Sequence, residues 1–117
     1  MLEIMAADLS VLLEHLSSRL IVLDLRRRDE LEEYPYIIPG ALLTTEAEPQ
    51  TLIGWLPPGT WVVLYGMDSI PKGCSRLHLL RDDLSFYVLS GGLRAWWSAD
   101  LAMDSVDHHA GGLRARG

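Results

Sequence analysis

Apolar positions along the chain fall into short runs separated by turn-forming residues. Four leucines within residues 8–17 follow the i, i+3, i+4, i+7 spacing of an amphipathic helix. Residues 20–25 and 61–65 are almost uniformly apolar, which is typical of parallel strands covered on both faces by helices. Such alternation of strand-like and helix-like segments predicts an α/β fold, with residues 20–25 as its central strand.

Weaker patterns complete the predicted topology. The segment 66–72 is expected to be a loop that connects the strand 61–65 to a helix. Beyond Met103 the chain is polar and rich in glycine, so we expect one domain over residues 1–103 and a loose tail over 104–117. The remaining expected elements are an edge strand at 2–5, a short charged helix near 26–33, an extended piece at 42–43, a weak helix at 49–56, a helix at 73–84, a strand at 86–89 and a helix at 93–99 with Trp96 inward.

Length and composition narrow the class of protein. The chain has 117 residues and a mass of 13.1 kDa, which suits a single core, and a mean hydropathy of +0.14 excludes disorder over most of its length. Its apolar runs are far shorter than the roughly 20 residues that span a bilayer. No basic stretch precedes a long apolar run at the N-terminus. We therefore expect a cytoplasmic protein without membrane insertion.

Charge and cysteine content exclude further classes. The formal net charge is −6 and the pI about 5.0, which disfavours nucleic-acid partners. The basic run at 26–28 is followed at once by four acidic residues, a pattern typical of a solvated, ion-paired helix. Cys74 is the single cysteine, so an intramolecular disulfide and a multi-cysteine zinc site are both excluded. No pattern indicates an oligomeric state.

Four short motifs then occur in a recognisable order. Together they resemble the rhodanese-like domain over about residues 4–101. The resemblance implies a mostly parallel five-stranded sheet flanked by helices, with the active-site loop directly after the third motif. The motifs are Leu23-Asp24-Leu25-Arg26 followed by Glu30, Ile38-Pro39-Gly40-Ala41, Val62-Val63-Leu64-Tyr65, and Leu89-Ser90-Gly91-Gly92-Leu93-Arg94-Ala95-Trp96.

The residue after the third motif departs from the family. In active rhodaneses this position is a cysteine, which accepts a sulfane sulfur as a persulfide and passes it to an acceptor such as cyanide or a thiol. Here the position is Gly66. Gly91 follows 25 residues later, the spacing that the resemblance implies, so the register supports a missing rather than a shifted nucleophile. A hydrogen atom offers neither a nucleophile nor an attachment point for sulfur.

The loop itself, Gly66-Met67-Asp68-Ser69-Ile70-Pro71-Lys72, also differs from the family's Gly- and Arg-containing cradle. Asp68 adds negative charge where an anion would enter, and Pro71 removes one backbone donor. Lys72 retains positive charge, although a solvated lysine is equally expected there.

Cys74 is the alternative nucleophile. In a helix over 73–84 it would lie in the first turns, where the helix dipole lowers the pKa of a thiol. His78 would share its face and serve as a base. The competing interpretation is that Cys74 fills space in the core. A phosphatase loop of the form Cys-x5-Arg is not supported, because Arg81 lies one residue too far from Cys74.

Other residues that suggest chemistry have structural interpretations. Asp24 and Arg26 are expected to be architectural, with Arg26 paired to Glu30 at i, i+4. Trp55, Trp61, Trp96 and Trp97 are expected in or beside the core, with Trp97 the most exposed. Asp104, Asp107, His108 and His109 have side chains suited to metal binding but lie in the expected tail, so neither a metal site nor a cofactor is predicted.

Two hypotheses of different classes follow. The leading one is a rhodanese-like binding or regulatory module without sulfur chemistry, which recognises a protein partner at the Gly66 loop. The alternative is a divergent thiosulfate or persulfide sulfurtransferase that uses Cys74, with His78 as base. A third is that glycine at position 66 is an engineered replacement.

Overall fold

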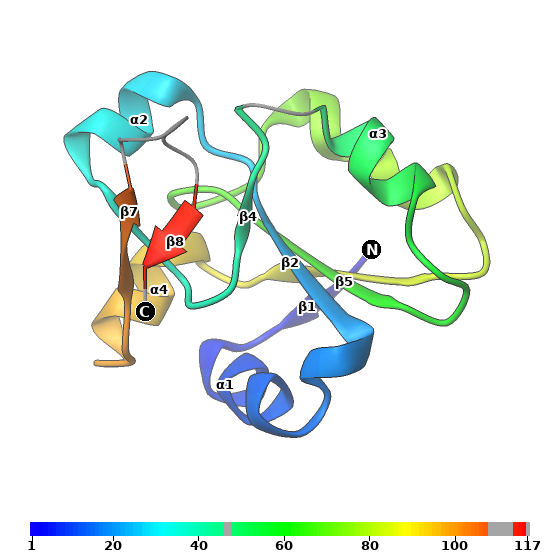
Figure 1. Cartoon of the computed structure of the whole chain (residues 1–117), viewed down its shortest axis with the longest axis horizontal. Coiled ribbons are helices and arrows are strands. Elements are labelled where there is room, and N and C mark those ends of the chain that lie inside the picture. The colour runs from blue at the N-terminus through cyan, green and yellow to red at the C-terminus, as the bar shows by residue number, and fades with distance from the viewer. Residues whose placement is uncertain (46–47, 108–113, 117) are drawn as a thin grey trace.

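The computed structural model describes residues 1–45, 48–107 and 114–116. Its main sheet has five parallel strands in the order β1-β6-β5-β2-β4, which confirms the predicted α/β fold (Figure 1). The centre of the sheet is β5, whereas the sequence favours β2. The strands are β1 (Leu2–Ile4), β2 (Leu20–Asp24), β4 (Leu42–Leu43), β5 (Trp61–Tyr65) and β6 (Ser85–Leu89).

Helices cover both faces of this sheet. On one face, α1 (Ala6–His15) and α4 (Gly92–Ser98) bury Leu9 and Trp96 in a first core cluster. On the other face, α3 (Pro49–Gly54) buries Ile53 in a second cluster. The charged segment forms the short helix α2 (Arg28–Glu33), as predicted. None of the helices described is long and apolar enough to cross a membrane.

Alternation along β5 explains why this strand is uniformly apolar. Val63 and Tyr65 belong to the first core cluster, while Val62 and Leu64 belong to the second, and all four are 0% exposed. Successive side chains of a strand point to opposite faces, so a strand covered on both sides needs apolar residues at every position.

The Ile38-Pro39-Gly40-Ala41 motif forms a tight turn before β4. The N–H of Ala41 donates to the carbonyl of Ile38 at 3.0 Å, and Gly40 has φ +80°. Proline at the second position and a residue of positive φ at the third are the requirements of a type II turn. Pro39 and Gly40 are therefore structural residues, as predicted.

The prediction of a helix over residues 73–84 is wrong. The structure has two 3₁₀ turns instead, Lys72–Cys74 and Leu77–Leu79, separated by Ser75 and Arg76. Gly73 and Ser75 both favour turns over helix interiors, which explains why a continuous α-helix does not form.

The C-terminal segment is also not the loose tail that the sequence predicts. β7 (Asp104–Asp107) pairs antiparallel with β3 (Tyr36–Ile37), and β8 (Arg114–Arg116) pairs with β7 in a small second sheet. Val106 is 6% exposed and joins the first core cluster. The fold therefore continues beyond Met103. His108 and His109 lie outside the described residues.

Candidate functional site

Two neighbouring strands bring the motif residues to one edge of the sheet. β2 and β5 are parallel, with Asp24 opposite Tyr65, and the N–H of Leu25 donates to the carbonyl of Tyr65 at 2.8 Å. Ligands of parallel α/β sheets bind at this carboxyl edge. An open pocket of about 180 Å³ lies there, lined by Leu25, Arg26, Arg27, Glu30, Gly66, Met67, Ser69, Ile70 and Pro71.

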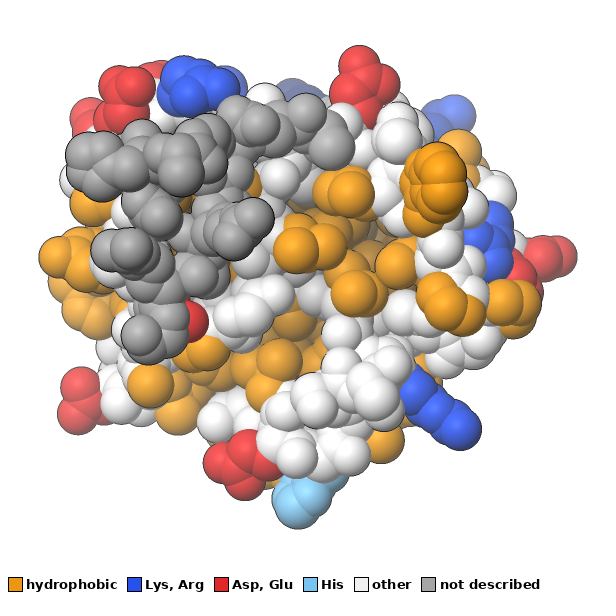
Figure 2. Space-filling view, in the orientation of Figure 1, with side chains coloured by type: hydrophobic (Ala, Val, Ile, Leu, Met, Phe, Trp, Pro, Cys, Tyr) orange, Lys and Arg blue, Asp and Glu red, His pale blue; other side chains and the backbone are white. Residues whose placement is uncertain are grey.

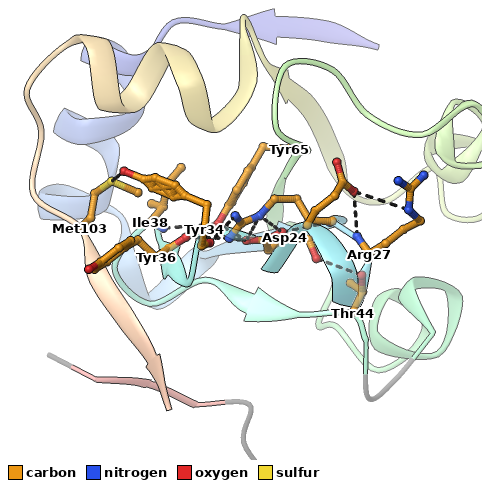
Figure 3. Close-up of polar contacts among 10 residues, drawn as sticks. Asp24, Arg27, Tyr34, Tyr36, Ile38, Thr44, Tyr65 and Met103 are labelled. Atoms are coloured by element: carbon orange, nitrogen blue, oxygen red, sulfur yellow. Dashed lines mark hydrogen bonds and ion pairs between the residues drawn. The ribbon is translucent and has the colours of Figure 1, made fainter. Parts of the chain in front are cut away.

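A buried polar network lies beneath the pocket (Figure 3). The guanidinium of Arg26 donates to both carboxylate oxygens of Asp24, with Nη2 to Oδ2 at 2.8 Å, and both side chains are 0% exposed. The hydroxyl of Tyr65 donates to Asp24 Oδ2 at 2.7 Å and accepts from the N–H of Ile38 at 3.3 Å. Because Tyr65 immediately precedes Gly66, the network fixes the start of the loop.

Arg26 also holds two backbone carbonyls. Its Nη1 donates to the carbonyl of Tyr34 at 2.9 Å, and its Nη2 donates to that of Tyr36 at 2.6 Å. The expected pair with Glu30 is wrong, since the Glu30 carboxylate instead accepts from the N–H of Arg27 at 3.0 Å at the start of α2. Buried charges are retained when they are paired and hydrogen-bonded, as Arg26 is, which agrees with an architectural role.

The environment of Tyr65 opposes its ionisation. Burial raises the pKa of its hydroxyl well above the usual value, and the adjacent Asp24 carboxylate raises it further. Tyr65 is therefore a neutral hydrogen-bond donor at physiological pH. The sequence indicated it only weakly, as a tyrosine that ends an otherwise aliphatic strand.

The loop closes tightly over Gly66. A β-carbon added at this position would overlap the carbonyl oxygen of Ser69 and lie 3.1 Å from its carbonyl carbon. Both are backbone atoms, which cannot rotate away as a flexible side chain does. In this loop conformation, position 66 accepts glycine alone.

The start of α4 is packed against the same loop. The N–H groups of Leu93 and Arg94 donate to the carbonyls of Gly66 and Met67 at 2.9 and 3.0 Å. Gly92 has φ +62°, and a β-carbon there would lie 2.6 Å from each of those carbonyl oxygens. Glycine at position 92 therefore permits the close approach that the hydrogen bonds need.

Asp68 is paired rather than free. Its carboxylate accepts from Nε of Arg94 at 2.5 Å, and the two side chains are 64% and 58% exposed. Exposed pairs of this kind contribute little to stability, so the backbone contacts of α4 dominate. Neither the role of Arg94 nor this pairing was predicted from the sequence, because the partners are 26 residues apart.

Solved structures with the same architecture include three informative ones. A thiosulfate sulfurtransferase from Pseudomonas aeruginosa aligns with a TM-score of 0.71 and 21% identity over 89% of this chain. A rhodanese-related protein from Thermoplasma volcanium aligns with a TM-score of 0.66 and 18% identity, over 88% of this chain and 97% of that chain. A rhodanese-like domain from Anabaena sp. aligns with a TM-score of 0.65 and 21% identity, over 92% of this chain and 82% of that chain. The fold is rhodanese-like.

At these identities the similarity establishes the rhodanese-like fold alone. This chain spans 19% of the length of the Pseudomonas enzyme. No protein-family model matches the sequence, and no curated protein matches it.

Within the rhodanese-like fold, Cys74 is not among the residues that line the pocket. It ends the first 3₁₀ turn and is partly buried against the second core cluster. Burial raises the pKa of its thiol, the opposite of what a reactive cysteine needs. Among the described residues no hydrogen bond joins Cys74 to His78, whose Nδ1 is buried without a partner. The expected helical Cys-His face is absent because the helix is absent.

The remaining expected features are placed as follows. Gly91 has φ +75° and Trp96 is buried, with its indole N–H donating to the carbonyl of Ala102 at 2.9 Å. Of the four tryptophans Trp55 is the most exposed, at 83%, so the expectation for Trp97, at 51%, is wrong. Within residues 1–45, 48–107 and 114–116, no group of three metal-ligating side chains occurs.

Proposed function

We propose that this rhodanese-like domain is a binding module without sulfurtransferase activity and that it recognises a protein partner at the Gly66 loop. The observation that carries the proposal is the contact between Ser69 and position 66. The carbonyl of Ser69 occupies the space that a nucleophilic side chain would need. Sulfur transfer requires a thiolate at the pocket, and glycine supplies none.

The polarity of the loop supports the same conclusion. An anion such as thiosulfate is held by backbone N–H groups that converge on it. Here a carbonyl oxygen from Ser69, with its partial negative charge, points at Gly66. The donors of Leu93 and Arg94 at the start of α4 are already used by the carbonyls of Gly66 and Met67.

The alternative nucleophile has no support from its surroundings. The thiol of Cys74 has a raised pKa and packs against core side chains. Cys74 is also not among the residues that line the pocket at Gly66 and Ile70.

The pocket itself suits recognition. Its walls combine the apolar side chains of Leu25, Met67, Ile70 and Pro71 with the exposed charge of Arg27. A volume of about 180 Å³ accommodates one side chain of a bound protein segment. Concave apolar sites with a few polar groups are the usual anchors of such segments.

A thiocyanate assay tests the catalytic half of the proposal. The purified full chain is incubated with thiosulfate and cyanide beside an active rhodanese at equal concentration. We expect thiocyanate formation at the rate of the protein-free control. Turnover above that rate that is lost in Cys74→Ser would contradict the proposal and establish the divergent enzyme.

Saturable binding tests the recognition half. A partner bound at the Gly66 loop should protect the backbone amides of residues 66–71 from hydrogen exchange. Substitution Ile70→Glu, in the pocket wall, should weaken that binding. The matched control Leu2→Glu, on the exposed edge strand β1, should leave it unchanged.

A further inference from the structure

Three aromatic side chains lie in contact where the ends of α2 and α4 meet. The ring of Tyr34 packs edge to face with the ring of Trp97, with centroids 4.7 Å apart, and with that of Tyr36, at 5.1 Å. Trp97 and Tyr36 are 51% and 45% exposed. We call these three residues the aromatic surface. None of them lines the pocket at Gly66, so the surface is a separate feature.

The buried polar network holds the aromatic surface in place. The guanidinium of Arg26 donates to the carbonyls of Tyr34 and Tyr36, which fixes the backbone that carries both rings (Figure 3). The hydroxyl of Tyr34 donates to Sδ of Met103 at 3.8 Å. Tyr36 also belongs to β3, which pairs with β7. Because the rings are positioned in advance, binding orders few further groups.

An acidic residue adjoins the rings at the end of each helix. Glu33 ends α2 and directly precedes Tyr34. Asp100 follows α4, and its N–H donates to the carbonyl of Trp97 at 2.9 Å. Both are exposed, and neither forms an ion pair within the described part of the chain. In Figure 2, hydrophobic side chains gather at the left edge of the molecule, below α2 and beside α4, with acidic side chains above and below them.

Basic residues are absent from the chain on either side of these rings. Residues 29–71 and 95–113 contain neither lysine nor arginine. Arg28 is the first residue of α2, about 9 Å along the helix axis from Tyr34. Arg94 lies one turn before Trp97, but its guanidinium is paired with the carboxylate of Asp68. The rings therefore lie at the acidic ends of both helices.

The small second sheet supplies the other basic residues of this region. Arg114 and Arg116 belong to β8, and β7 lies between β8 and Tyr36 of β3. Adjacent strands are about 4.8 Å apart, which places β8 about 10 Å from β3. With both included, nine carboxylates still outnumber six arginines over residues 24–37, 68, 94–107 and 114–116. The region thus has the negative sign of the whole chain, whose net charge is −6.

We propose that the aromatic surface docks a basic segment of a partner protein, whose arginine side chains stack on Trp97 and Tyr36 and pair with Glu33 and Asp100. Cations are attracted to the face of an aromatic ring within about 6 Å of its centre. The planar guanidinium also binds carboxylates through paired N–H groups, so arginine uses both features of the surface. This inference goes beyond the proposed function, because it concerns a second site.

A proline-rich segment fits the same surface less well. Such segments dock on aromatic rings, but they offer no charge to the carboxylates of Glu33 and Asp100. Bringing an uncharged segment over those carboxylates removes water from them without replacing it by a cation, which costs free energy. Docking of a proline-rich segment is accordingly an outcome that the experiment must separate from docking of a basic one.

Four matched peptides provide the probes, each with blocked ends that carry no charge. Three alternate glycine with one further residue, which is arginine, citrulline or glutamate. Citrulline has the shape of arginine without its charge. The fourth is an uncharged proline-rich peptide of equal length. Binding to the full chain is followed by amide and indole N–H chemical shifts. We expect the arginine peptide to bind at least about fivefold more tightly than the citrulline peptide, with shifts at residues 33–36 and 97–100.

A ring variant separates stacking from general attraction. An acidic protein attracts an arginine peptide at many places, so a variant that leaves the net charge unchanged is needed. Trp97→Leu should weaken the arginine peptide at least about threefold. Trp55→Leu is the matched control, because Trp55 is exposed and lies outside the aromatic surface, directly after α3. It should leave binding unchanged.

A charge variant tests the carboxylates without altering the rings. The double variant Glu33→Gln, Asp100→Asn should weaken the arginine peptide at least about threefold and reduce the effect of added salt. Asparagine tolerates the positive φ of Asp100, which is 62°. The control Asp8→Asn, Glu14→Gln makes an equal change in charge at exposed positions of α1 and should alter binding less than about twofold.

Several results would overturn the inference. These are equal binding of the arginine and citrulline peptides, tighter binding of the glutamate or the proline-rich peptide, and no binding of any peptide. Shifts centred outside the aromatic surface would also contradict it, as would equal losses in Trp97→Leu and Trp55→Leu. None of these results bears on the thiocyanate assay, so the proposed function is tested separately.

Discussion

The carbonyl oxygen of Ser69 lies in the volume that a β-carbon on Gly66 would occupy. The loop therefore depends on glycine at this position, and adding a side chain requires the backbone to move. Because α4 holds the Gly66 and Met67 carbonyls through two N–H groups, such a movement breaks further contacts. Glycine at position 66 and closure of the loop are two aspects of one arrangement.

A side chain at position 66 should destabilise the protein. Gly66→Ala forces the loop backbone away from its present position, at a cost of about 1–3 kcal/mol in the free energy of unfolding. Gly73→Ala is the matched control, because a β-carbon there meets nothing within 4 Å. Urea unfolding of both variants measures the difference. Equal stability of the two would contradict the closed loop.

The approach of α4 to the loop should depend on Gly92. Alanine there adopts a strained positive φ and collides with the carbonyls of Gly66 and Met67. Gly59→Ala separates the two effects, since Gly59 has φ +83° but open space around it. We expect a loss of about 1–2 kcal/mol for Gly59→Ala from strain alone. Gly92→Ala should lower the free energy of unfolding by about 1–3 kcal/mol more than Gly59→Ala, because overpacking adds to the strain. The same unfolding experiment measures both.

The hydroxyl of Tyr65 should contribute to stability through Asp24. Tyr65→Phe removes the donor to the buried carboxylate and leaves the N–H of Ile38 without its acceptor, at a cost of about 1.5–3 kcal/mol. Tyr87→Phe is the control, because no hydrogen bond of the Tyr87 hydroxyl is found among the described residues and its ring stacks on Trp61 at 5.4 Å. A loss as small as that of the control would show that the network is dispensable.

The raised pKa of Tyr65 also sets a direction for alkaline pH. The unfolded tyrosine releases its proton near pH 10, about its ordinary pKa, while the folded one keeps it. The native state then binds more protons than the unfolded state, so stability falls as pH rises through that range. Tyr65→Phe should make this fall shallower in unfolding measured between about pH 9 and pH 11.

Cys74 should behave as a partly buried thiol that is not activated. Burial raises its pKa, and the thiolate is the species that alkylating reagents attack. We expect iodoacetamide to modify the folded chain more slowly than the urea-unfolded chain at every pH, with the folded midpoint shifted to higher pH. A folded midpoint below that of the unfolded thiol would indicate an activated cysteine and favour the alternative enzyme.

Burial on both faces made much of the fold predictable. β2 and β5 are apolar at nearly every position, and α1 has the leucine spacing of an amphipathic helix. The turn at Pro39 and Gly40 was predictable because it requires a particular backbone geometry. These features are local, so the sequence carries them directly.

Other features depend on distant partners. β7 contains one apolar residue, Val106, and its pairing with the two-residue β3 leaves no periodic signal. Arg26 has a nearer partner in Asp24 than in Glu30, because the end of β2 directs both side chains into the same buried space.

The candidate site was predicted in position but not in conformation. The resemblance placed the loop after β5, where the pocket lies. The contact of Ser69 with Gly66 depends on the path of the backbone, which residue types do not specify. The same is true of the hydrogen bonds from α4 to the loop carbonyls. The helix over 73–84 was predicted because its leucines have helical spacing. It does not form because Gly73 and Ser75 favour turns.

Intact-mass spectrometry after incubation with thiosulfate tests the central claim most directly. An active rhodanese gains one sulfur, about 32 Da, as its cysteine persulfide and releases sulfite. For this chain we predict an unchanged mass under conditions in which the active rhodanese is fully loaded. A gain of about 32 Da that disappears in Cys74→Ser would contradict the account and identify Cys74 as a sulfur acceptor.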